Sequence, residues 1–147
     1  MPDPFELERF VEAQAGVYAR VRGELERGEK RSHWMWFIFP QLLGLGASPL
    51  ARRYAIRSLE EARAYLAHPL LGARLTECTR LVNAHGTRTA GAIFGYPDDL
   101  KFRSAMTLFA HAAPGPQGQP FRTALAQFFA GEEDPLTRAR LSQACGT

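Results

Sequence analysis

A repeated helix-start signal constrains the fold of this 147-residue chain more than any other feature. Asp3-Pro4, Ser48-Pro49 and Asp134-Pro135 each place a capping side chain directly before a proline. Such a pair is typical of a helix N-terminus, because the side chain accepts a free backbone N–H and proline fits the first turn. Ser58-Leu59-Glu60-Glu61 has the spacing of a capping box, and Gly28 stands where a helix is expected to end.

Apolar residues between these signals recur at helical spacing, as in the series Leu71, Leu75, Cys78 and Val82. No stretch alternates polar and apolar residues as a strand would, and the β-leaning run 37–39 is too short to build a sheet. We therefore predict an all-α fold, a compact multihelical single domain of seven or eight helices over residues 1–147. The expected helices cover residues 4–28, 48–56, 58–68, a stretch that ends near 84, 89–94, 97–112, 119–131 and a last stretch from 134 onwards.

Composition and charge narrow the class of protein. Hydrophobic residues make up 46% and charged residues 22%, which is ordinary for a soluble globular domain. The formal net charge of +3 is small and the cations are spread along the chain, which argues against a nucleic-acid partner. The chain has no run of 18 apolar residues and no signal-peptide pattern at its start, so no membrane span or secretion is expected.

The two cysteines, Cys78 and Cys145, form no CxxC pair and no disulfide framework, which favours a reducing cytoplasm. Cys78 shares an apolar helical stripe, so we expect it to be buried and unpaired. Cys145 is expected to lie in a frayed C-terminus.

The segment from Lys30 to Gln41, called the tryptophan segment below, holds both tryptophans of the protein. It places two cations, a serine and His33 directly against a bulky apolar run that stops at a proline. Trp34 and Trp36 diverge on a helix, so one can stack on a ligand ring or a cation while the other packs inward. The alternative is that both belong to the core. His33 is the candidate catalytic residue, as a general acid or base, and the alternative is a structural residue at a helix start.

Two further groups depart from the pattern of their helices. Gln14 lies within an apolar stripe, where an unpaired amide would cost about 1–3 kcal/mol, so its partner is either a ligand or a structural hydrogen bond. In the helix over 97–112, Ser104 and Thr107 occupy the face opposite the core stripe, with Lys101 at its edge. A solvent-facing helix surface normally carries long charged side chains, so this face either binds something polar or packs closely on another helix.

Motifs for metals and nucleotides are missing from the sequence. It has no HExxH motif and no His/Cys pair at zinc spacing, so we expect neither a metal nor a cofactor. The glycine-rich run 44–49 leads into a helix N-terminus of the kind that can hold an anion, but it matches neither a P-loop nor a Rossmann fingerprint. A tight turn is the alternative interpretation.

The order of these motifs resembles one known family. Residues 28–42, followed by Gly44-Leu45-Gly46, are similar to the signature of the bacterial family called domain of unknown function 1810. The similarity continues through Tyr54-Ala55-Ile56, His68-Pro69 and the run 104–109, and it covers nearly the whole chain. The resemblance implies a compact, mainly helical single domain, as in the solved mycobacterial-type members, and it brings no established activity.

Two functional hypotheses follow, and neither fixes the oligomeric state. The first is a pocket that binds or processes a small polar anionic metabolite, such as a nucleotide or an ADP-ribose-like compound, with Gln14, His33, Trp34, Lys101 and Ser104 converging on it. The second is a non-catalytic protein-interaction module that uses the tryptophan segment as its hot spot. The candidate ligand-binding residues are Gln14, Lys30, Arg31, Ser32, His33, Trp34, Trp36, Gln41, Lys101, Ser104 and Thr107.

Overall fold

The structure is a computed structural model that describes residues 3–145 and the side chains of residues 3–143. Within this range the chain forms ten α-helices and one 3₁₀ turn. This part contains no strand, only an isolated bridge between Leu42 and Ile56, so the predicted all-α class is confirmed. The helices are α1 Glu8–Gln14, α2 Tyr18–Arg27, α3 Met35–Ile38, α4 Pro49–Arg53, α5 Leu59–Ala67, α6 Leu71–Asn83, α7 Ala90–Phe94, α8 Asp98–Ala112, η1 Pro116–Gly118, α9 Gln119–Phe129 and α10 Pro135–Cys145.

The helix count differs from the expected seven or eight at two places. The single helix predicted over 4–28 is divided into α1 and α2 by a turn at Gly16, whose φ of +79° no helix can contain. The carboxylate of Asp3 accepts the N–H groups of Leu7 and Glu8, so α1 begins later than the proline signal suggested. The second addition is α3, a single turn formed inside the tryptophan segment.

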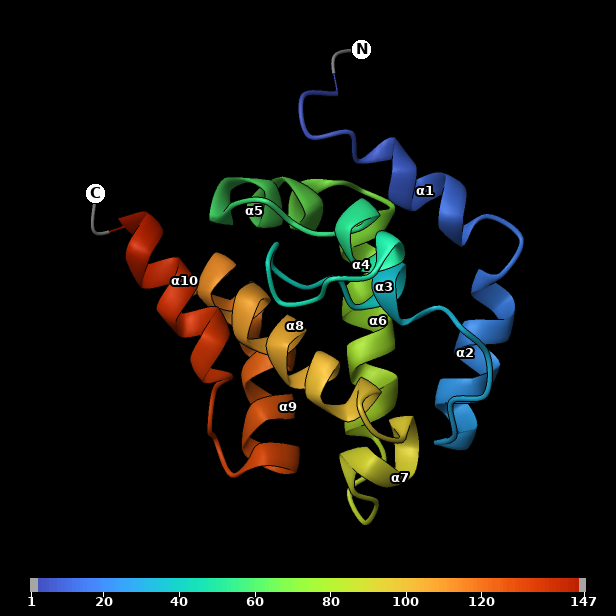
Figure 1. The fold of residues 1–147 in the computed structure, drawn as a ribbon. Coiled ribbons are helices and arrows are strands. Elements are labelled where there is room, and N and C mark those ends of the chain that lie inside the picture. The colour runs from blue at the N-terminus through green and yellow to red at the C-terminus, as the bar shows by residue number, and fades with distance from the viewer. Residues whose placement is uncertain (1–2, 146–147) are drawn as a thin grey trace.

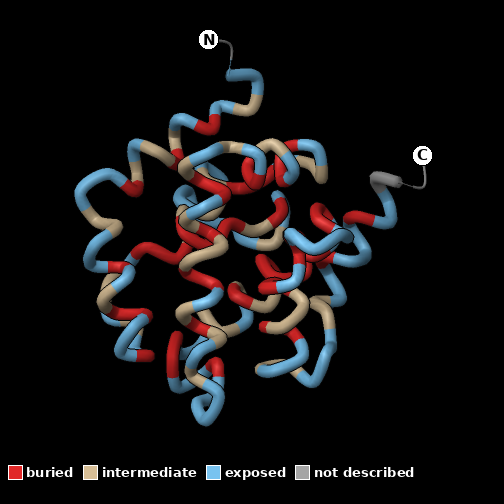
Figure 2. Tube along the Cα trace, turned by 180° about the vertical axis from the view of Figure 1, so that it is seen from behind, coloured by how far each residue is buried: buried red, intermediate tan, exposed pale blue. Residues whose placement is uncertain are grey.

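Helix α6 runs through the centre of the molecule, with α2 on one side and α8, α9 and α10 on the other (Figure 1). It packs against α2, α5 and α9, and α8 in turn packs against α5, α7, α9 and α10. Figure 2 shows that the buried positions lie inside this arrangement and that the exposed ones follow its outline. The core near α8 is aromatic: the rings of Phe39 and Phe94 lie 5.0 Å and 4.7 Å from that of Phe102.

Arg9 ties the first helix to the segment between α4 and α5. Its guanidinium donates to the carboxylate of Glu61 at 2.7 Å and to the backbone carbonyls of Arg53 and Ala55, each at 2.9 Å. Glu61 is buried, so this ion pair is shielded from solvent and its loss would leave an uncompensated charge.

Cys78 is buried and free, as the sequence predicted. Burial raises the pKa of its thiol to about 12, which keeps the sulfur protonated and unreactive at neutral pH. The side chain of Cys145 lies outside the described residues.

Helices α5 and α6 approach each other closely at Gly72. A Cβ at this position would lie 2.0 Å from the backbone oxygen of Leu66, a contact that only backbone movement can relieve. A side chain at Gly86 would meet no atom within 4 Å, and its backbone is not in the left-handed region.

We expect Gly72→Ala to lower the free energy of unfolding by about 1–3 kcal/mol, because overpacking displaces one helix from the other. Chemical denaturation measures this, with Gly86→Ala as the matched control that stays near the parent value. Equal stabilities for the two variants would contradict the close approach.

Candidate functional site

The carboxylate of Glu24 organises the start of the tryptophan segment. Glu24 projects from α2 into the protein and is 2% exposed. It accepts the backbone N–H groups of Arg31 at 2.7 Å and Ser32 at 2.9 Å, the hydroxyl of Ser32 at 2.6 Å and the indole N–H of Trp34 at 2.9 Å. Four donors around one buried carboxylate fix the path of the chain from Arg31 to Trp34.

These four hydrogen bonds also control the protonation of Glu24. Burial by itself raises the pKa of this carboxyl, but the Ser32 hydroxyl, the two backbone N–H groups and the Trp34 indole outweigh it and lower the pKa to about 2. Glu24 is therefore ionised at neutral pH, and its negative charge holds the four donors of the tryptophan segment in place.

Lys30 and Lys101 connect the tryptophan segment to α8 through one aspartate. The ammonium groups of Lys30 and Lys101 lie 2.8 Å and 3.3 Å from carboxylate oxygens of Asp98, which stands in the first turn of α8. Lys30 also lies over the ring of Trp34 at 5.1 Å, and Lys101 over the ring of Trp36 at 5.4 Å. Two lysines share one carboxylate, so this cluster keeps one surplus positive charge beside Trp36.

Four of the predicted residues line one cavity of about 390 Å³: Trp36, Gln41, Lys101 and Ser104. Trp36 and Gln41 come from the tryptophan segment, and Lys101 and Ser104 come from α8. The remaining lining comes from the loop before α4, the start of α8 and the start of α10: Leu45, Gly46, Ala47, Ser48, Ala51, Pro97, Leu100, Asp134 and Leu136.

Gln41 and Ser104 offer polar atoms to this cavity. The side-chain amide of Gln41 is half-buried and makes no hydrogen bond to any residue whose side chain the structure describes. The hydroxyl of Ser104 donates to the carbonyl oxygen of Leu100 at 3.1 Å, which leaves its lone pairs free to accept. The cavity thus combines an aromatic ring, a cation, a free amide and a hydroxyl acceptor with one carboxylate, that of Asp134, which accepts two hydrogen bonds from Thr137.

The predicted convergence is wrong for Gln14, Trp34 and His33, none of which lines this cavity. Gln14 is buried and has internal partners: its amide N–H₂ donates to the carbonyl oxygen of Phe37 and the hydroxyl of Tyr65, and its oxygen accepts from Arg74. Trp34 is 2% exposed and bonded to Glu24, and His33 is exposed to solvent. For Gln14 the structural hydrogen bond is therefore the alternative observed, and of the two tryptophans Trp34 packs inward while Trp36 is half-buried at the cavity.

Three further candidates have structural roles that the contacts explain. Ser32 is bonded to Glu24, and Arg31 is exposed and paired with Glu29 at 3.1 Å. Thr107 donates to the carbonyl oxygen of Arg103 and accepts the N–H of Asp134, so it joins α8 to the start of α10. Of the two small hydroxyl side chains on α8, that of Thr107 joins helices and that of Ser104 lines the cavity.

Sequence reasoning missed several cavity residues because their types suggested helix starts. Ser48 accepts the N–H of Ala51 and caps α4, as expected, yet it also faces the cavity. Asp134 accepts the N–H and the hydroxyl of Thr137 and is likewise part of the lining. The exposed side chains of Leu100 and Leu136 carried no signal, since a single surface leucine is ordinary.

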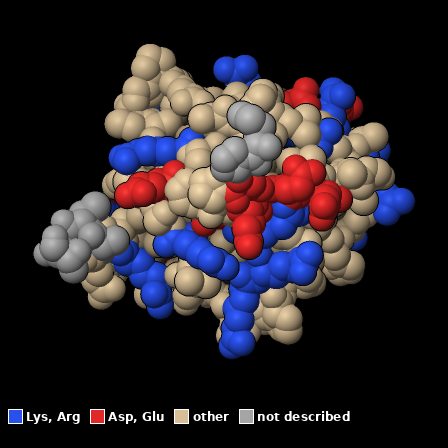
Figure 3. Space-filling view, turned by 90° about the horizontal axis from the view of Figure 1, so that it is seen from above, with Lys and Arg blue, Asp and Glu red and all other residues tan. Residues whose placement is uncertain are grey.

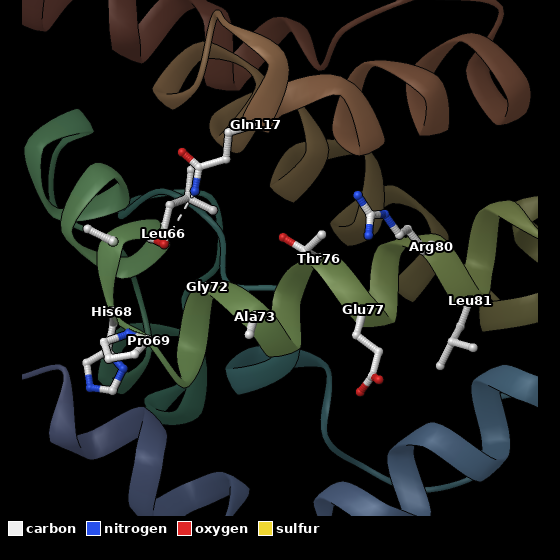
Figure 4. A pocket seen from close by; sticks show the side chains of 11 residues that line it. Leu66, His68, Pro69, Gly72, Ala73, Thr76, Glu77, Arg80, Leu81 and Gln117 are labelled. Carbon is white, nitrogen blue, oxygen red and sulfur yellow. Dashed lines mark hydrogen bonds between the residues drawn. The ribbon is translucent and has the colours of Figure 1, made fainter.

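A larger groove of about 620 Å³ follows the surface of α6 but does not gather its polar groups (Figure 4). Figure 4 shows Thr76 and Gln117 on one side of the helix and Glu77 on the other. Glu77 is already engaged, since it accepts the hydroxyl of Tyr18 and pairs with Arg22 at 3.3 Å. Convergent polar groups distinguish a binding site from a surface depression, so the smaller cavity beside Trp36 is the candidate site.

The described residues add three observations on charge, metal binding and membrane spans. Basic side chains form a band next to a cluster of acidic ones on the face seen from above, so that face carries both signs (Figure 3). Among the described side chains, those of residues 3–143, there is no cluster of three or more His, Cys, Asp or Glu residues placed to hold a metal ion. No helix within residues 3–145 has the length and apolar character needed to cross a membrane.

Comparison with known proteins shows to which family the chain belongs. The model of the family described as "Protein of unknown function (DUF1810)" matches residues 4–141. The chain belongs to the DUF1810 family. This DUF1810 chain is also similar to the conserved hypothetical protein Rv1873 from Mycobacterium tuberculosis, seen in a crystal structure, with 59% identity and a TM-score of 0.93 over 95% of this chain and 99% of that chain. A comparison with curated proteins found no match.

We expect the Glu24 carboxylate to make this DUF1810 protein sensitive to acid. Its pKa is about 2 in the folded protein against an ordinary 4.5, so its contribution is complete above pH 4.5 and is lost as the pH falls toward 2. That contribution is about 3 kcal/mol of unfolding free energy.

Denaturation across this pH range measures the effect in the parent protein and in Glu24→Gln. The variant should be less stable at neutral pH and should lack this part of the acid dependence. Glu26→Gln, an exposed carboxylate on the same helix, is the matched control. An unchanged acid profile in Glu24→Gln would show that the carboxylate does not organise the segment.

Proposed function

We propose that the protein binds a small polar metabolite, which carries a planar ring and an anionic group, in the cavity between the tryptophan segment and α8. A nucleotide or an ADP-ribose-like compound has both features. The observation that carries this proposal is Trp36, half-buried at the cavity with the ammonium of Lys101 5.4 Å from its ring centre. An indole offers a stacking surface for the ring, and the lysine offers a charge for the anion.

The surplus charge of the Lys30–Asp98–Lys101 cluster supports an anionic ligand. Lys30 is only 7% exposed and holds Asp98 at 2.8 Å, so Asp98 does not depend on Lys101 for its counter-charge. Lys101 is 28% exposed and its distance to Asp98 is longer, at 3.3 Å. Lys101 is therefore the lysine of the pair that can turn toward a ligand while Asp98 keeps Lys30 as its partner.

The free amide of Gln41 supports recognition of a polar ring edge. An amide can donate and accept at once, as the edges of nucleobases require, and Gln41 has no competing partner among residues 3–143. Gln14 shows the contrast, since every polar atom of its amide is bonded within the protein. We assign no reaction to the site, because the lining contains no nucleophile paired with a base.

A protein-interaction function is the second candidate, and a different observation favours it. Leu100 and Leu136 are 45% and 64% exposed at the edge of the cavity, and Tyr96 nearby in the chain is 82% exposed. Exposed apolar residues around a depression are typical of a surface that receives a partner. In that case the partner contacts would come from these side chains and not from the buried Trp34.

A thermal-shift screen against nucleosides, nucleotides and dinucleotides tests the proposed function. A ligand at 100 times its dissociation constant adds about 2.7 kcal/mol of stability, which such a screen detects. We expect at least one ring-containing anion to stabilise the protein and Lys101→Ala to lose most of that effect. The variant itself should stay within about 1 kcal/mol of the parent, because it removes a partly exposed ion pair.

Arg31→Ala is the matched control, since it also removes one positive charge but from an exposed position outside the cavity. It should bind as the parent does. Gln41→Leu, which keeps the approximate shape of the side chain, should weaken binding without a large loss of stability. Stabilisation that is equal in Lys101→Ala and the parent contradicts the assigned site, and a screen without any stabilising ligand favours the interaction module.

A further inference from the structure

A second cavity, of about 410 Å³, takes part of its lining from the same loop and from the same helix α10 as the Trp36 cavity. Two arginines and no carboxylate line it, and we call it the arginine cavity. Its lining consists of Leu42, Leu43, Arg57, Ser58, Leu59, Arg140, Leu141 and Gln143. A cavity with two cations and no counter-charge in its walls has the character of an anion site.

The two arginines of this cavity are exposed and have few partners within the protein. The guanidinium of Arg57 has no hydrogen bond or ion pair to any residue with a described side chain, and Arg140 makes only a 3.4 Å contact to the carbonyl oxygen of Gly44. Arg122, in contrast, donates to three successive backbone carbonyls from Ala113 to Gly115. The carboxylate of Glu61 accepts the backbone N–H of Arg57 but is paired with Arg9.

Two chain segments, the loop before α4 and the helix α10, each contribute residues to both cavities. In the loop, Leu42 and Leu43 line the arginine cavity, and Leu45 to Ser48 line the Trp36 cavity. On α10, Leu136 lines the Trp36 cavity and Arg140 the arginine cavity. Residues four apart on a helix lie on one face with Cβ atoms about 6 Å apart, so the two cavities are neighbours along this face.

Gly44 and Arg140 meet at the boundary between the two cavities. Gly44 has a φ of +98°, and a Cβ there would lie 2.4 Å from the guanidinium carbon of Arg140. The guanidinium therefore lies directly against the loop backbone, at the residue before Leu45, which lines the Trp36 cavity. The glycine that the sequence assigned to a tight turn also makes room for this arginine.

We propose that the arginine cavity receives the phosphate groups of the ligand whose ring lies beside Trp36, so that the ligand is a nucleoside diphosphate or a similarly extended phosphorylated ring compound. This inference rests on the proposed function for the position of the ring. Arg140 and Arg57 hold the phosphate oxygens, and the hydroxyl of Ser58, whose oxygen accepts the N–H of Glu61, still has its proton to donate. The ribose bridges the two cavities past Gly44.

The experiment titrates inorganic pyrophosphate, adenosine and ADP separately into the parent protein, Arg140→Ala, Arg57→Ala and the charge-matched control Arg31→Ala, with affinity measured by calorimetry. We expect pyrophosphate to bind the parent and Arg31→Ala equally, and about tenfold more weakly to each cavity variant, since each loses charge-assisted hydrogen bonds. ADP should bind the parent at least about tenfold more tightly than adenosine does. That advantage should disappear in Arg140→Ala, while adenosine binding stays unchanged.

The outcomes separate the two proposals. Absent pyrophosphate binding, or binding that falls equally in Arg140→Ala and Arg31→Ala, overturns the arginine cavity even if adenosine binds beside Trp36. Adenosine binding that Gln41→Leu weakens, together with an ADP advantage that Arg140→Ala retains, leaves the proposed function standing and overturns this inference. If pyrophosphate binds through the arginines but adenosine does not bind, the proposed function is overturned. The inference that one ligand occupies both cavities is then overturned as well.

Discussion

A single buried carboxylate, that of Glu24, determines how the most unusual segment of this chain is held. An ionised carboxylate away from water is costly unless every oxygen is bonded, and here two backbone N–H groups, a hydroxyl and an indole N–H supply those bonds. The same bonds turn Trp34 inward. Because Trp34 is held there, α3 can begin at Met35 and Trp36 is left on the side that faces α8.

The Lys30–Asp98–Lys101 cluster then joins that segment to α8. Lys30 follows the end of α2, and its own N–H donates to the carbonyl oxygen of Ile93 at 2.7 Å, so its ammonium reaches Asp98 from a fixed position. Asp98 lies in the first turn of α8, where a negative charge is also favoured by the helix dipole. The cavity beside Trp36 therefore has two walls that polar contacts hold together, and Lys101 is the member of the cluster left nearest to solvent.

The sequence predicted the helices well because their signals are local, whereas the cavity depends on contacts between distant residues. Ser48 and Ser58 each cap a helix as their spacing indicated, since a cap involves only the next three residues. Gln14 and Gln41 show why the site was harder. Both are amides in partly apolar surroundings, but the partners of Gln14 come from residues 37, 65 and 74, and no local pattern reveals them. Glu24 was not singled out for the same reason, because its donors lie seven to ten residues away.

The position of the ring beside Trp36 is the central claim, and the two indole N–H resonances of this protein test it most directly. Trp34 and Trp36 are the only tryptophans, and their indole N–H groups give two signals in a nitrogen–proton correlation spectrum, which Trp36→Phe assigns. During titration with a stabilising nucleotide, the account predicts that the Trp36 signal shifts progressively while the Trp34 signal, held by Glu24, stays in place. A titration in which the nucleotide binds and the Trp36 signal does not move would contradict it.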